Sequence, residues 1–79
     1  MERTKAFETV KKYILAQLPI SEDRVVESAA LIDDLGADSA NLMMLVMDLE
    51  AEFNMTVDDE MIGTIRTVGD IVDYIEKKA

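Results

Sequence analysis

Apolar residues recur at helical spacing from the start of the chain. The first repeating positions are Phe7, Val10, Ile14 and Leu18. Intervals of three and four residues place these side chains on one face, so the pattern predicts an amphipathic helix over residues 2–17. Pro19 ends this helix, because the residue before a proline is pushed out of the helical region.

A second helix is predicted from residue 38 or 39 to about residue 53, with Asn54 as its stop. The expected core stripe is Leu42, Leu45, Leu49 and Phe53. Both Asp38 and Ser39 are suited to the N-cap, since their side chains accept hydrogen bonds from first-turn amides. More apolar residues remain than one buried face needs, and we expect them to form a second strip beside the first: Met43, Met44, Val46 and Met47.

The last helix begins near Thr67, where Asp70 three residues later predicts a capping box with Asp in place of Glu. Its apolar positions are Val68, Ile71, Val72 and Ile75. Before it, a short helical turn is expected to start at Thr56, Asp58 or Asp59 and to include Met61, Ile62 and, at its limit, Ile65. No stretch alternates cleanly between apolar and polar residues, so no strand is predicted.

Residues 19–37 have no sustained period but many apolar side chains, so this long connection is expected to pack on the helices. Ser21 is expected to cap a short turn, residues 31–35 to form another, and Gly36 to allow a sharp or left-handed bend. The prediction is an all-α fold in one domain, residues 1–79: a small bundle of three main helices and one short helix, with a long first loop.

Composition excludes several functions. The chain has no cysteine, histidine or tryptophan, so it offers no thiolate or imidazole for catalysis or for zinc, and we predict that it is not an enzyme. Seventeen acidic against eight basic residues give a net charge of −9, which disfavours nucleic acid and anionic membranes and favours protein partners with basic patches. We expect a cytoplasmic monomer without stable membrane association.

Ser39 is the candidate functional residue. No base accompanies it, so it is not a catalytic nucleophile, but a phosphate on a serine at a helix N-terminus is electrostatically favoured. The alternative from the residues alone is that Ser39 only caps the helix. The acidic clusters at residues 33–38 and 58–60 fit no EF-hand register, so no metal site is predicted.

Three runs carry a resemblance to a known family: DLGADS at 34–39, LVMDLEAEF at 45–53 and TIRTVGDIVDYI at 64–75. The chain resembles the acyl carrier proteins of fatty-acid and polyketide synthesis along nearly its whole length. The resemblance implies a 4′-phosphopantetheine arm on Ser39, next to Asp38 of the motif, installed by a phosphopantetheinyl transferase from coenzyme A. It also implies basic partner enzymes and an acyl pocket among Leu42, Leu45, Leu49, Phe53, Ile65 and Ile71.

The chain departs from the family after the serine. Ala40 replaces the usual leucine, and Asn41 and Met44 stand where acids are common. We therefore expect a specialised carrier whose recognition surface is more apolar: Ala40, Met43, Met44, Met47 and Glu50. Two alternatives stay open, an interaction module of the same fold in which Ser39 only caps, and an aminoacyl or peptidyl carrier. The latter more often has a second glycine where Asp38 stands.

Overall fold

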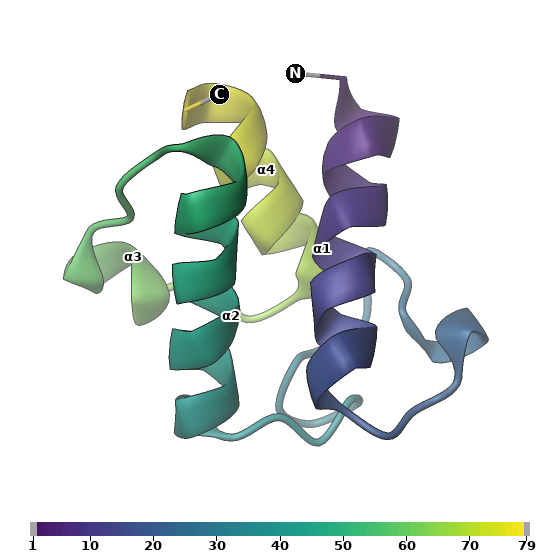
Figure 1. Cartoon of the computed structure of the whole chain (residues 1–79). Helices are drawn as coiled ribbons and strands as arrows, with labels where there is room; N and C mark the ends of the chain where they lie inside the picture. Colours follow the sequence, from purple (N-terminus) through teal and green to yellow (C-terminus); the bar gives the residue numbers. More distant parts are fainter. Residues whose placement is uncertain (1, 79) are drawn as a thin grey trace.

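The computed structural model describes residues 2–78, except for the side chains of Asp59 and Met61, and it forms a helical bundle (Figure 1). The helices are α1 (Arg3–Gln17), the 3-10 turn η1 (Glu22–Arg24), α2 (Ser39–Phe53), α3 (Asp59–Ile62) and α4 (Val68–Lys78). This confirms the all-α prediction of three main helices and one short one. The predicted Met61 side chain of α3 lies outside the described residues, and Ile65 follows the helix instead of belonging to it. None of the described helices is long and apolar enough to cross a membrane.

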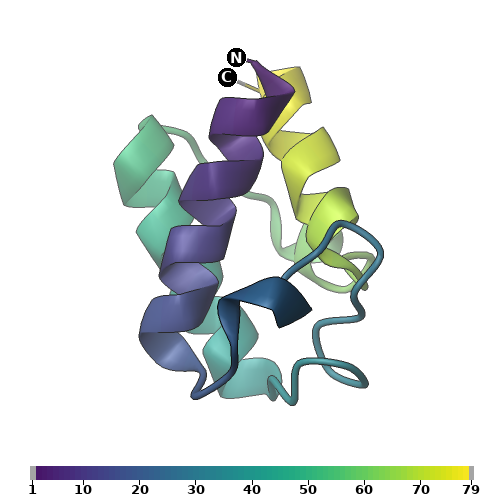
Figure 2. The ribbon, with the colours of Figure 1, turned by 90° about the vertical axis from the view of Figure 1, so that its right-hand side faces the viewer.

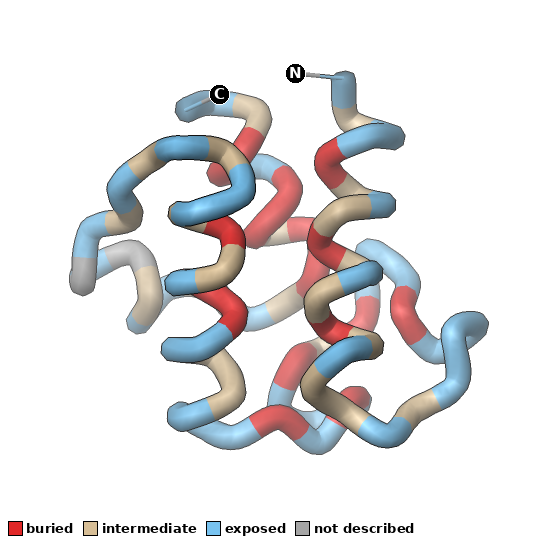
Figure 3. Tube along the Cα trace, in the orientation of Figure 1, coloured by how far each residue is buried: buried red, intermediate tan, exposed pale blue. Residues whose placement is uncertain are grey.

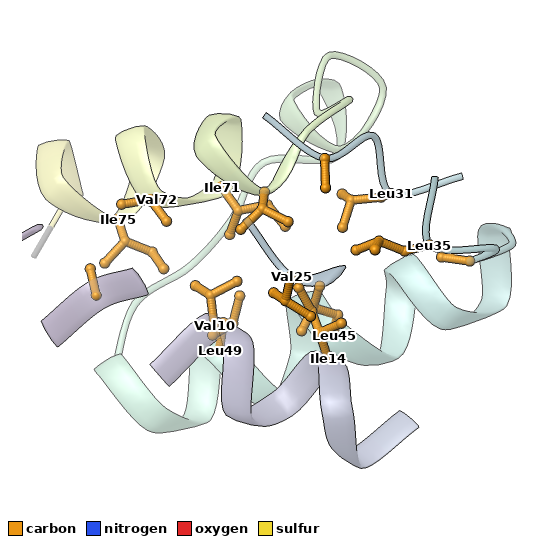
Figure 4. Packing of buried hydrophobic residues seen from close by; sticks show 14 residues of the cluster. Val10, Ile14, Val25, Leu31, Leu35, Leu45, Leu49, Ile71, Val72 and Ile75 are labelled. Carbon is orange, nitrogen blue, oxygen red and sulfur yellow. The ribbon is translucent and has the colours of Figure 1, made fainter. Parts of the chain in front are cut away.

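The core lies where α1, α2 and α4 face one another (Figures 3 and 4). It includes the predicted residues Val10 and Ile14 of α1, Leu45 and Leu49 of α2, and Ile71, Val72 and Ile75 of α4. Phe7 and Leu18, also predicted, are only partly buried, and Ala6 is fully buried instead. On the helical wheel Ala6 lies on the Val10 side of the predicted stripe, so the buried face of α1 is rotated toward Ala6 and away from Phe7 and Leu18.

The long connection between α1 and α2 packs against the bundle, as predicted, and wraps around one side of it (Figure 2). Its buried side chains are Val25, Ala29, Leu31, Leu35 and Ala37. The backbone is also tied to the start of α4, because Leu31 N–H donates to Arg66 O at 2.9 Å and Gly69 N–H donates to Glu27 O at 2.8 Å. An isolated antiparallel bridge between Ala30 and Thr67 completes this seam. The connection is therefore a fixed part of the fold.

Helix ends follow the sequence signals in most places. The Thr67 hydroxyl accepts the Asp70 N–H at 3.2 Å and the Asp70 carboxylate accepts the Thr67 N–H at 3.1 Å, so the predicted capping box is present. Asn54 ends α2 in the left-handed conformation with φ 51°. The prediction for Ser21 is wrong in one respect: the turn η1 follows it, but its side chain makes no capping hydrogen bond. The Ser21 carbonyl accepts the Arg24 N–H instead.

Arg3 joins three parts of the molecule. Its guanidinium pairs with Glu27 of the long connection and with Asp73 and Glu76 of α4, at 2.6 Å for Asp73. These carboxylates hold the pKa of Arg3 above its ordinary value, chiefly through the hydrogen bond to Glu27. In a chain of net charge −9, one cation thus relieves the repulsion among three acids at the end of the bundle where α1 begins and α4 ends.

Candidate functional site

Ser39 is the first residue of α2, and Asp38 is its N-cap. The Asp38 carboxylate accepts the Asn41 N–H at 2.9 Å, and the Asn41 side-chain oxygen accepts the Asp38 N–H at 3.1 Å. The cap is thus Asp38, not Ser39. The Ser39 side chain is exposed, and its hydroxyl makes no hydrogen bond within residues 2–78. The interpretation of Ser39 as a helix cap is therefore wrong.

The turn before Ser39 is held rigidly. Gly36 adopts a positive φ of 75°, as the sequence predicted, and its N–H donates to Ile32 O at 3.1 Å. Ala37, two residues before Ser39, is buried, and its N–H donates to Leu31 O at 2.9 Å. A buried residue on each side of the glycine, Leu35 and Ala37, anchors the turn to the core. The exposed serine therefore follows directly after a turn whose backbone is anchored to the core.

Asn41 stands where the resemblance implies an acid, and its side chain keeps the acceptor oxygen that an acid would offer to the N-cap. As the third residue of α2 it closes the capping box, which needs a side-chain acceptor facing back toward the N-cap. Its amide also lies 3.3 Å from the side-chain amide of Gln17 in α1. The first turn of α2 is therefore tied both to its own cap and to the neighbouring helix.

The chemistry of this site is that of an acceptor for a covalent group. The Asp38 carboxylate accepts the Asn41 N–H, and the Asp38 carbonyl accepts the Leu42 N–H at 3.0 Å. The N–H groups of the first two residues of α2 are therefore the ones left without an acceptor in the helix or its cap. Those amides and the helix dipole favour an anion on the Ser39 oxygen. An exposed, unpartnered hydroxyl at this position fits a phosphodiester. No cluster of three metal-ligating side chains occurs among the described residues.

Four of the six predicted acyl-pocket residues line one hollow between α2, α3 and α4. We call this hollow the apolar recess, and its lining is Leu42, Leu45, Val46, Ile62, Ile65 and Ile71. Leu49 is buried deeper in the core and Phe53 is half-buried at its margin, so neither lines the recess. Ile62 was missed as a lining residue because its role depends on where α3 lies.

Val46 corrects one sequence prediction. It was expected on the apolar strip beside the core stripe, but only 6% of it is exposed. At 100° per residue, Val46 lies beside Phe53 at one edge of the core stripe, on the side opposite Leu45, so the buried face is wider than that stripe. The position of α3, whose Ile62 lines the same recess as Val46, could not be read from the periodicity of α2.

The outer face of α2 carries the other residues of that strip. Met43, Met44 and Met47 are 47%, 57% and 62% exposed, and Ala40 is exposed beside Ser39. We call these four residues the outward strip. Glu50, the fifth predicted recognition residue, differs from them because it is half-buried and its carboxylate accepts the Val57 N–H at 2.9 Å. The strip begins one residue after the candidate attachment point and contains no charge.

Comparison with known proteins agrees with this geometry. Residues 8–75 match the family model described as a phosphopantetheine attachment site. The chain is 55% identical over 76 residues to the acyl carrier protein of Thermotoga maritima, covering 96% of this chain and 94% of that protein.

Two solved structures are similar over most of their length. The acyl carrier protein from Enterococcus faecalis has a TM-score of 0.84 at 38% identity, with all of both chains covered. A putative acyl carrier protein from Mycobacterium tuberculosis has a TM-score of 0.83 at 32% identity, covering 91% of this chain and 96% of that one. The chain therefore belongs to the acyl carrier protein family and is a non-catalytic carrier of acyl groups on a covalently attached 4′-phosphopantetheine.

Proposed function

We propose that Ser39 is the residue to which the 4′-phosphopantetheine arm is attached. The observation that supports this most is that Ser39 is exposed at the first position of α2 with a free hydroxyl, while its neighbour Asp38 provides the cap. When bound, the arm supplies a thiol that holds the acyl group as a thioester. The chain itself supplies the hydroxyl, and Asp38 and Asn41 hold the turn that presents it.

The proposal is tested by intact-mass analysis. The unmodified protein is incubated with coenzyme A, Mg²⁺ and a promiscuous phosphopantetheinyl transferase. We expect the wild type to gain the mass of one arm and Ser39→Ala to gain none. Ser28→Ala, which removes an exposed serine of the long connection, is the matched control and should be modified like the wild type. An unmodified wild type would contradict the proposal.

We propose the apolar recess, extended by Leu49 and Phe53 behind it, as the place where an acyl chain is sheltered. The support is that its lining is entirely aliphatic and lies along α2, whose N-terminus carries Ser39. Apolar surface of this kind favours a methylene chain over water by about 0.8 kcal/mol per buried CH₂. Leu42→Asp is therefore expected to weaken protection of a decanoyl thioester, measured by its cleavage with hydroxylamine.

The outward strip and Glu50 are proposed as the surface that selects partner enzymes of fatty-acid or polyketide synthesis. Three exposed methionines without an intervening charge suit an apolar contact, while the acidic remainder of the surface favours basic patches. By this proposal the carrier is specialised, because its apolar surface restricts the partner enzymes that can use it. If a general ketosynthase or acyl-carrier synthetase used it as readily as a housekeeping carrier, the specialisation would be refuted.

The strip also distinguishes the carrier from an interaction module of the same fold. For a carrier, Met44→Glu is expected to weaken use by a partner enzyme and leave attachment of the arm intact. If Ser39→Ala preserved all function while Met44→Glu abolished it, the interaction module would be the better description.

A monomeric state, a cytoplasmic location and a single domain over residues 1–79 stay predictions from the sequence.

A further inference from the structure

Glu50 holds the segment between α2 and α3 with both its side chain and its backbone. Its carboxylate accepts the Val57 N–H at 2.9 Å, and its carbonyl accepts the N–H groups of Asn54 and Met55, the latter at 3.1 Å. The left-handed Asn54 turns the chain back along α2. Because α3 begins two residues after Val57, the Glu50 side chain anchors the backbone just before α3.

α3 forms a wall of the apolar recess through Ile62. The open space in the recess is about 10 Å³, which is close to the minimum for one water molecule, so several methylene groups do not fit. The walls formed by α2 and α4 belong to the packed core, whereas α3 is a helix of four residues. Since so short a helix has little stability of its own, α3 is the least firmly held of the three walls.

We propose that Glu50 is a positioning residue that limits the length of the acyl chain the recess accepts. The inference rests on the proposed function, because it needs an acyl chain attached at Ser39. Displacing α3 to make room draws Val57 away from the Glu50 carboxylate, so a long chain enters only when this charge-assisted hydrogen bond breaks. A two-carbon acyl group is too short to need the recess. The contact therefore biases the carrier toward short cargo.

The test compares acetyl and decanoyl thioesters on the loaded carrier, with cleavage by hydroxylamine as the measure of exposure. In Glu50→Ala the decanoyl thioester is expected to be cleaved more slowly than in the wild type, by up to about tenfold, because a hydrogen bond to a charged group shifts an equilibrium by about that factor. The acetyl thioester should be unaffected. Glu50→Gln keeps an oxygen that accepts the Val57 N–H but loses the charge, so its cleavage rate should lie between those of the wild type and Glu50→Ala.

Glu52→Ala is the matched control. It removes an acid from the same helix, but the Glu52 carboxylate accepts the Tyr13 hydroxyl and pairs with Lys12, both of α1, and within the described residues no hydrogen bond joins it to the segment before α3. A merely structural role for Glu50 predicts faster cleavage in Glu50→Ala, or the same change for both chain lengths. Either result, or an equal change in Glu52→Ala, would overturn the inference.

Hydrogen exchange on the protein without its arm provides a second measurement. In Glu50→Ala the amides of Val57 and Ile62 should exchange about tenfold faster than in the wild type. If Ile62 is unchanged, Glu50 does not position α3. Should no variant accept the arm, the proposed function fails, and the exchange data still decide the role of Glu50.

Discussion

A methyl group added at Gly69 tests how firmly the long connection is fixed to α4. Gly69 lies in the first turn of α4 and is buried, and its N–H donates to the Glu27 carbonyl at 2.8 Å. A Cβ at this position would stand 3.0 Å from that same oxygen and 3.6 Å from the Glu27 Cβ. The oxygen belongs to backbone that the neighbouring hydrogen bonds at Leu31 and Val68 also hold.

The magnitude follows from two opposing effects. Replacing glycine by alanine within a helix is ordinarily favourable by about 0.5–1 kcal/mol. Extra volume in a packed place costs about 1–3 kcal/mol. Because the close contact is with restrained backbone and not with a flexible side chain, we expect the cost to exceed the gain. Gly69→Ala should therefore lower the free energy of unfolding by about 1 kcal/mol, a fall in Tm of about 4–8 °C for a domain of this size.

Gly63→Ala is the matched control. A Cβ there would have its nearest neighbour, the Glu60 carbonyl oxygen, at 3.6 Å, which is ordinary contact, and Gly63 does not adopt a positive φ. This variant should be neutral or more stable by up to about 1 kcal/mol. Both are measured by urea and thermal unfolding followed by far-ultraviolet circular dichroism. If Gly69→Ala is as stable as Gly63→Ala, the seam between the connection and α4 is loose and the reasoning is refuted.

Three further predictions concern the caps and the charges. Asp38→Ala should destabilise the protein by about 1 kcal/mol in urea unfolding, whereas Ser39→Ala should change stability by less than about 0.5 kcal/mol; equal losses would mean that Ser39 shares the cap. Hydrogen bonds from the Arg66 and Thr67 amides lower the pKa of Asp70 from its ordinary 3.8, so its stabilisation is present at neutral pH and lost as the pH falls through the lowered pKa. The stability advantage of the wild type over Asp70→Asn should accordingly shrink in acid, and a constant difference from pH 7 to pH 3 would contradict this sign. Arg3→Gln should lower Tm at low salt and have less effect at about 1 M salt, where exposed charges are screened; an effect independent of salt would argue for packing instead.

Local patterns predicted the helices well. Val10 and Ile14, or Ile71 and Ile75, recur at helical intervals because a buried helical face imposes that spacing on the sequence. The box between Thr67 and Asp70 depends on residues three apart, so it too could be read locally. The bend at Gly36 was predictable because few other residues tolerate a positive φ.

Contacts between distant residues were not predictable in this way. Nothing near Leu31 in sequence indicates that its N–H donates to Arg66, because the pairing depends on how the connection folds back on α4. Glu50 shows the same limit. A glutamate in an amphipathic helix is usually solvated, so the sequence suggested a recognition residue, and only the structure reveals the bond from its carboxylate to the Val57 amide.

For the candidate site, the sequence identified the serine but not the reason that its hydroxyl is free. Asp38 and Ser39 were equally good caps by residue type. The choice between them depends on Asn41, whose side chain faces back to Asp38 and closes a reciprocal pair of hydrogen bonds. That geometry leaves Ser39 exposed and unpartnered at the helix start.

Tandem mass spectrometry of the modified protein tests the central claim most directly, because it assigns the arm to a residue. Ser21 and Ser28 are the other serines of the chain, and both are exposed in the long connection. We expect the added mass of the arm in every fragment ion that contains Ser39 and in no other, which places the arm on Ser39. An arm located on Ser21 or Ser28, or a wild-type protein that never acquires one, would contradict it.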